Sequence, residues 1–132
     1  MADLPRPTSR PLSPHITVFR PSITMVISIV HRITGAANYF GMLLLAWWLL
    51  AAASGPAAFE TAQGFFGSPI GWIVLFGYTW SVTHHWLGGI RYLIWDTGRG
   101  LGKPARDQIA WANVIGSVTL TILLWIVALI VR

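Results

Sequence analysis

The sequence predicts an all-α integral membrane protein whose three transmembrane helices run up, down and up. The first observation is composition, because the 132 residues are 55% hydrophobic and only 10% charged, whereas about a quarter of a soluble domain is charged. The second is that charged residues are missing from three long stretches, at 33–59, 61–90 and 108–131. Each stretch exceeds the ~20 apolar residues that a helix needs to cross a bilayer. The short connections between them favour antiparallel neighbours.

We expect residues 1–21 to form an N-terminal arm and residues 22–132 a three-helix membrane domain. The arm is rich in proline and lacks the apolar core of a signal peptide. The first helix is expected at 22–53, since Pro21 precedes it and Ser54, Gly55 and Pro56 stop it. The second is expected at 70–96, after Pro69, and the third at 109–131.

Lysine and arginine lie almost entirely on one side of these expected spans. Eight of them precede the first span or flank the second connection: Arg6, Arg10, Arg20, Arg32, Arg91, Arg99, Lys103 and Arg106. Only Arg132 lies on the other side. This bias predicts a cytoplasmic N-terminus and an external C-terminus. It also argues against a nucleic-acid partner, because the cations flank apolar segments instead of lining one face.

Polar residues within the expected spans are the candidate functional residues, because a bilayer makes polarity costly. Ser28, His31 and Arg32 lie three or four positions apart at the start of the first span, so they can face one neighbour. For Arg32, simple extension to the interface explains the charge equally well. For Ser28, a hydrogen bond to the carbonyl four residues earlier is the structural alternative.

The second expected span contains two adjacent histidines, His84 and His85, with Gly88 and Gly89 one turn away. His85 lies ~16 Å along the helix from Asp96, which is well inside the membrane. A neutral imidazole there needs a partner, which is either a carbonyl or hydroxyl of another helix or a haem iron. The glycines leave room for a flat group or for a close helix. The absence of cysteine leaves histidine as the strong metal ligand.

Three motifs carry a resemblance to a known family. They are Arg10-Pro11-Leu12-Ser13-Pro14-His15, Ser28-Ile29-Val30-His31-Arg32-Ile33-Thr34-Gly35, and His85 followed after three residues by Gly89-Ile90-Arg91 and then by Asp96. From residue 10 to its end the chain resembles the cytochrome b556 membrane-anchor subunits of succinate dehydrogenase, respiratory complex II. The resemblance implies half of a heterodimeric helical anchor. A second anchor subunit, an iron-sulfur subunit and a flavoprotein subunit would be its partners, together with membrane lipid.

The resemblance also implies site residues and a location. His85 would be an axial ligand of haem b, with the other ligand supplied by the partner anchor. His31 and Arg32 would meet the haem propionates, while Ser28 and Arg32 would line the ubiquinone pocket. Family members often have histidine where this chain has Tyr92, which cannot carry positive charge at neutral pH.

The implied location is a bacterial inner membrane, with the C-terminus in the periplasm, and the isolated chain would have no activity. The alternatives are the anchor of a related fumarate reductase and a structural anchor without haem. A small transporter subunit is the weakest interpretation, because the outer halves of the expected spans lack ionisable residues.

Overall fold

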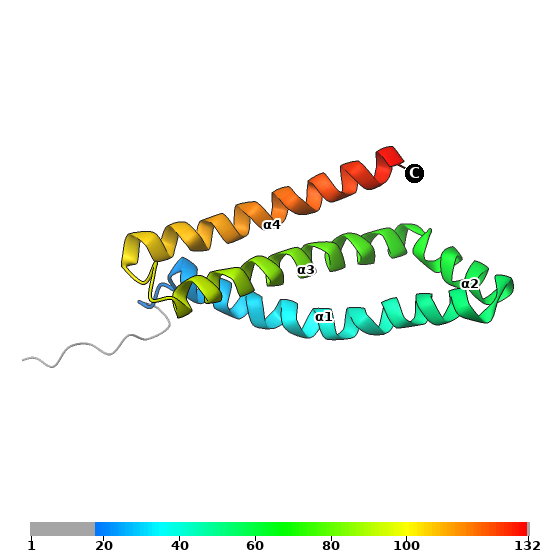
Figure 1. Cartoon of the computed structure of the whole chain (residues 1–132), viewed down its shortest axis with the longest axis horizontal. Coiled ribbons are helices and arrows are strands. Elements are labelled where there is room, and N and C mark those ends of the chain that lie inside the picture. The colour runs from blue at the N-terminus through cyan, green and yellow to red at the C-terminus, as the bar shows by residue number, and fades with distance from the viewer. Residues whose placement is uncertain (1–17, 132) are drawn as a thin grey trace, which may run out of the picture.

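The computed structural model describes residues 18–131, and its regular structure there is entirely helical. The helices are α1 (Ile23–Ser54), α2 (Pro56–Phe66), α3 (Pro69–Asp96) and α4 (Lys103–Val131). Three long helices lie lengthwise beside one another, and the short α2 connects α1 to α3 at one end (Figure 1). Most of the expected arm at 1–21 lies outside the described residues.

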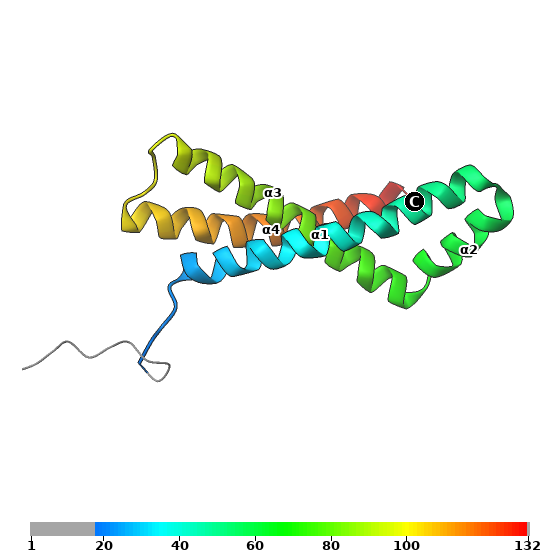
Figure 2. The same cartoon turned by 90° about the horizontal axis from the view of Figure 1, so that it is seen from below.

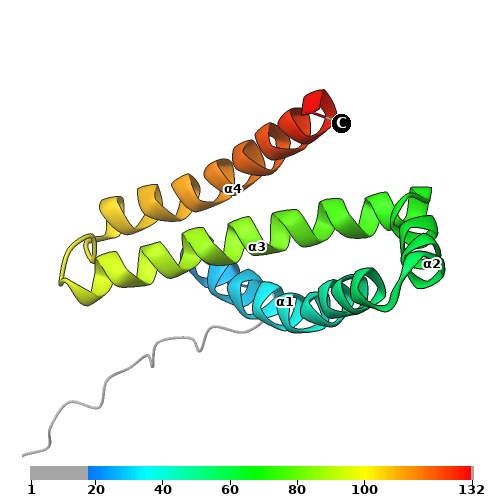
Figure 3. The same ribbon diagram turned by 45° about the vertical axis from the view of Figure 1, so that its right-hand side comes forward.

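Helix α3 is central in the bundle. It packs against both α1 and α4, and its first turns contact α2. Seen after a quarter turn, α3 crosses both α1 and α4 obliquely (Figure 2). Toward its C-terminus α4 diverges from α3 (Figure 3). We call the end where α1 begins, α3 ends and α4 begins the basic end of the bundle, because Arg32, Arg91 and Arg106 lie near it.

Two features of the elements differ from the sequence prediction. Helix α2 was not predicted, because Pro56 was taken only as a stop, whereas proline also suits the first turn of a new helix. Gly55 separates α1 from α2 at φ +118°, a conformation that favours glycine. The expected start of the last helix at residue 109 was also wrong. Helix α4 begins at Lys103. Pro104 does not prevent this earlier start, because it lies in the first turn, where proline is tolerated.

The packing reverses the pattern of a soluble protein. Large apolar side chains such as Phe40, Ile73 and Ile130 are 66%, 72% and 78% exposed. Polar side chains are buried between helices instead. Ser81 donates hydrogen bonds to Asn38 Oδ1 (2.7 Å) and to the Thr34 carbonyl (3.1 Å) on α1. A surface of this kind is covered by lipid or by another membrane subunit, while buried polar groups join the helices.

Two of the described helices, α1 and α4, are long and apolar enough by composition to cross a membrane. Helix α3 has 28 residues, which is also long enough, but its hydropathy is lower. The reason is that it carries buried polar residues, among them Ser81, Thr83, His84 and Arg91. The all-α membrane fold with three lengthwise helices is confirmed.

Candidate haem and quinone site

The close crossing of α1 and α3 brings His31 and His85 together. Their rings stack with centroids 4.0 Å apart and planes only 4° from parallel. Each ring rests on a glycine of the opposite helix. A Cβ on Gly88 would meet the His31 ring, with Cε1 only 2.9 Å away, and a Cβ on Gly35 would lie 3.1 Å from His85 Cε1. Of the two glycines expected to leave room, Gly88 therefore admits His31 of α1, whereas a Cβ on Gly89 would meet no other described residue within 4 Å.

Hydrogen bonds on α1 fix the protonation pattern of His85. Its Nδ1 lies 3.1 Å from the His31 carbonyl oxygen and 3.3 Å from Thr34 Oγ1. A carbonyl only accepts, and the Thr34 hydroxyl already donates to that same carbonyl (3.0 Å), so His85 Nδ1 is the donor. A neutral ring protonated at Nδ1 carries its free lone pair on Nε2.

His85 Nε2 has no hydrogen-bond partner among the described residues. It is also not one of the buried polar atoms that lack a partner, so it reaches the surface of the chain. His85 itself is half-buried. An unprotonated nitrogen held at the surface of a membrane helix is free to bind a ligand from outside this chain.

His84 points toward α4 and is only 2% exposed. Its Nδ1 lies 3.2 Å from Ser117 Oγ and 3.3 Å from Asn113 Nδ2. Thr83, which directly precedes His84, has its Oγ1 2.9 Å from Thr121 Oγ1, one turn beyond Ser117 on α4. His84 therefore belongs to a polar seam between α3 and α4. Adjacent residues of an α-helix point about 100° apart, and the contacts of His84 with α4 and of His85 with α1 agree with that geometry.

Ser28 and Arg32 line one cavity at the basic end, with a volume of about 430 Å³. Within the described part of the chain, Ser28 makes no side-chain hydrogen bond, so the structural alternative of a bond to the preceding turn is not observed. His31 does not line this cavity, because its ring turns to His85 and Gly88. The three polar residues expected to face one neighbour are thus divided: Ser28 and Arg32 line the cavity, and His31 packs against His85.

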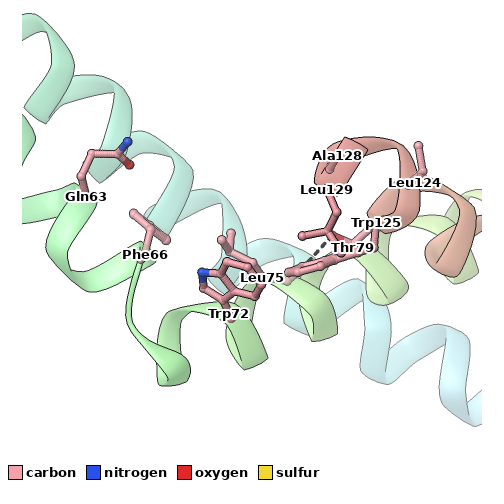
Figure 4. Close-up of a pocket in the computed structure, with 10 residues that line it drawn as sticks. Gln63, Phe66, Trp72, Leu75, Thr79, Leu124, Trp125, Ala128 and Leu129 are labelled. Atoms are coloured by element: carbon pink, nitrogen blue, oxygen red, sulfur yellow. Dashed lines mark hydrogen bonds between the residues drawn. The ribbon is translucent and has the colours of Figure 1, made fainter. Parts of the chain in front are cut away.

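A larger cavity, of about 670 Å³, lies at the opposite end, where α4 diverges from α3. Figure 4 shows Phe66 and Gln63 from α2 facing Trp72 and Leu75 of α3, with Leu124 and Leu129 across from them on α4. The dashed line joins Trp125 Nε1, the donor, to Thr79 Oγ1 at 3.3 Å. None of the residues expected at a functional site lines this cavity.

The comparisons with known proteins agree with one another. A family model described as "Succinate dehydrogenase/Fumarate reductase transmembrane subunit" matches residues 6–124. The chain belongs to this family. The succinate dehydrogenase cytochrome b556 subunit of Paracoccus denitrificans is 42% identical over 127 residues, covering 96% of this chain and 97% of that protein.

Two more distant relatives extend the comparison. The corresponding subunit of Rickettsia prowazekii is 37% identical over 117 residues, covering 89% of this chain and 91% of that protein. The mitochondrial succinate dehydrogenase cytochrome b560 subunit of Sus scrofa is 39% identical over 106 residues, covering 76% of this chain and 61% of that protein. This chain is thus a membrane subunit of the succinate dehydrogenase and fumarate reductase family.

Three residues that shape the candidate site were not predicted from the sequence. Gly35 and Thr34 stand in the quoted motif, yet only the structure shows that they seat and hydrogen-bond His85. Arg106 of α4 lines the same cavity as Ser28 and Arg32. No signal in the sequence pairs Arg106 with α1, because their proximity depends on the crossing of three helices.

Proposed function

We propose that this chain is the haem b-binding membrane-anchor subunit of a succinate:ubiquinone oxidoreductase. His85 is the observation that carries the proposal, because its Nδ1 is bound to α1 while its Nε2 reaches the surface. The names of the bacterial relatives, cytochrome b556 subunits of succinate dehydrogenase, support the same assignment, since a b-type cytochrome contains haem b. The chain would then anchor the catalytic subunits and contribute to quinone reduction.

The residues around His85 fit a haem. The Nε2 lone pair would hold the iron, and the Nδ1 hydrogen bond to the His31 carbonyl would orient the ring, as such bonds do for metal-binding histidines. We assign His31 and Arg32 to the propionate side, because both lie toward the basic end of α1. A histidine of the partner anchor would also bind the iron. The bound haem would supply one-electron redox chemistry.

The cavity at the basic end is the proposed ubiquinone site. Ser28 and Arg32 both line it, four residues apart on α1, and the hydroxyl of Ser28 is free of partners among the described residues. The guanidinium of Arg32 would donate to a quinone oxygen and stabilise the negative charge that develops there. Ser28 would donate to the other quinone carbonyl or to the methoxy side of the ring. Both residues act through preorganised hydrogen bonds instead of covalent chemistry.

Protons for the reduction would come from water at the basic end. Arginine keeps its proton in proteins, so Arg32 positions and stabilises the substrate without serving as an acid. The cation bias of the sequence supports placing this end in the cytoplasm and the C-terminus of α4 in the periplasm of a bacterial inner membrane. An iron-sulfur subunit docked at the basic end would receive electrons from the flavoprotein subunit.

The reverse assignment, a fumarate reductase anchor, remains the second candidate, since the family description covers both enzymes. The printed names of the relatives favour the dehydrogenase. The difference between the two enzymes lies in the direction of electron flow and in the quinone, so the same residues would serve either.

Two substitutions test the quinone assignment in the assembled complex. In Arg32→Leu and Ser28→Ala, succinate oxidation with a dye that accepts electrons before the membrane subunits should stay normal. Ubiquinone reduction should fall, by about a hundredfold for Arg32→Leu, because a preorganised donor to a developing oxyanion is lost. Ser28→Ala should cost less, since it removes a neutral donor.

The haem spectrum serves as the control, because Arg32 is also assigned to a propionate. An Arg32→Leu complex with a full complement of haem and a normal rate of ubiquinone reduction would remove Arg32 from the quinone site. Loss of dye-linked activity in either variant would mean that assembly, and not the quinone site, had been disturbed.

A further inference from the structure

The cavity at the basic end contains buried donors that nothing in the described chain satisfies. Arg91 is 1% exposed, and its Nε, Nη1 and Nη2 atoms all lack a hydrogen-bond partner among the described residues. The same is true of Trp95 Nε1 and Arg106 Nε. Arg91, Trp95 and Arg106 all line this one cavity. Every one of these five unpartnered atoms is a donor.

The charge at this cavity is equally one-sided. Arg32, Arg91 and Arg106 reach it from three different helices, and no acidic side chain is among its described lining residues. The guanidinium carbon of Arg91 lies 5.1 Å from the centre of the Tyr92 ring and 5.0 Å from that of Trp95. Ring faces attract the charge but leave the N–H groups in the guanidinium plane unbonded. A buried cation in this state requires an anion.

The position of Arg91 separates this site from the face that holds His85. Arg91 follows His84 by seven residues, so it lies within about 20° of His84 around the helix, on the side that faces α4. His85 faces α1. An anion at Arg91 would therefore occupy the α3 and α4 side of the cavity that Ser28 and Arg32 line from α1, away from the face assigned to haem.

The number of donors indicates the type of anion. Arg91 offers five N–H groups, and Trp95 Nε1 and Arg106 Nε offer one each, which makes seven. A carboxylate provides about four lone-pair sites. The phosphate of a phospholipid has four oxygens, two of them in ester bonds, and forked guanidinium donors bind phosphate in the same two-bond manner as carboxylate.

We propose that Arg91, Trp95 and Arg106 bind the phosphate of a phospholipid. Met25 and Ile29, on the α1 face that also carries Ser28 and Arg32, line the same cavity and are 46% and 57% exposed, so its mouth is apolar. The site lies at the end of the spans, where the headgroups of the adjacent leaflet are found, and tryptophan is typical of this level. The lipid would neutralise the buried cations and close the α3–α4 side of the cavity.

The test measures lipid bound to the whole complex. The wild-type complex, Arg91→Gln and Arg106→Gln are purified in detergent, washed to remove loose lipid, and analysed for phosphorus and by lipid mass spectrometry. We expect each variant to lose about one tightly bound phospholipid relative to wild type. Arg91→Lys, which keeps the charge but loses the fork, should retain an intermediate amount. Ser28→Ala is the matched control, since it lines the same cavity from α1, and should retain the lipid.

The alternatives give different results. Unchanged bound phosphorus in both glutamine variants would overturn the proposal. Separation of the subunits in those variants would then indicate that a carboxylate of a partner subunit occupies the site. A shifted haem spectrum would instead indicate a haem propionate. Occupation by inorganic phosphate, with no lipid in the wild-type complex, would overturn the assignment to a phospholipid. Arg106→Gln decides the matter if Arg91→Gln fails to assemble. Because bound phosphorus is the readout, failure of the quinone assignment would leave this result unaffected.

Discussion

The two ring nitrogens of His85 differ in their hydrogen bonding. The His31 carbonyl and the Thr34 hydroxyl on α1 occupy Nδ1, at 3.1 Å and 3.3 Å, and so Nε2 keeps the lone pair. Both acceptors belong to the helix against which α3 packs. The chemistry available at Nε2 therefore depends on how α1 and α3 cross, and not only on the presence of a histidine.

The two adjacent histidines should respond differently to substitution. His85→Ala should abolish the low-spin b-type spectrum of the assembled complex, because it removes the proposed axial ligand. His84→Ala should leave axial ligation intact, because this ring bonds Ser117 and Asn113 of α4. The measurement is the reduced-minus-oxidised absorbance spectrum of the purified complex. If His84→Ala were the change that removed the haem, the assignment of helix faces would be wrong.

Helix α3 owes its central place to having two different faces. Ser81 and His85 form hydrogen bonds with α1, while Thr83 and His84 form hydrogen bonds with α4. Between membrane helices apolar burial contributes little, because lipid is as apolar as the side chains. Polar bonds and close glycine contacts therefore decide which face of α3 meets which neighbour.

The glycine beneath His31 should be sensitive to a single methyl group. Gly88→Ala would place a Cβ against the His31 ring, which cannot move aside without leaving its stack on His85. We expect a loss of about 1–3 kcal/mol in stability, typical of overpacking. Gly77→Ala on the same helix is the control, since no other residue in the described part of the chain lies within 4 Å of its Cβ position. Thermal unfolding of the complex measures both, and an unchanged midpoint in Gly88→Ala would contradict the observed packing.

The long helices were predictable from sequence because missing charges mark spans directly. Helix α2 was not, since its 11 residues include Glu60, Gln63 and Gly64 and follow a proline that also serves as a stop. The face shared by Ser28 and Arg32 followed from helical spacing. The stack of His31 on His85 could not be predicted in this way, because it depends on the crossing of two helices that are far apart in sequence.

At the scale of the whole molecule, the surface is apolar along the bundle and basic at one end. The described positive side chains, such as Arg99, Lys103 and Arg106, gather near the connection from α3 to α4. The connection from α1 to α3 through α2 contains a single charge, Glu60. The asymmetry sets the orientation proposed above.

Reporter fusions test that orientation. An enzyme that is active only in the periplasm should be active when fused after Arg132, and silent when fused within residues 98–103. A cytoplasmic reporter at the same two positions serves as the control and should give the opposite pattern. Activity of the periplasmic reporter within residues 98–103 would show that the chain is inverted.

The polar seam between α3 and α4 has a consequence for how the chain is made. During synthesis α1 leaves the ribosome first and can bond Ser81 and His85 as soon as α3 enters the bilayer. Ser117 and Asn113 are added only later, so newly inserted α3 carries His84 without its partners on α4, while Thr83 still bonds the Thr79 and Trp80 carbonyls within α3. For that interval His84 lacks its partners inside the bilayer, where an unpaired polar group is costly. Insertion of α4 ends the exposure, and a chain truncated before α4 is the form that membrane proteases would recognise.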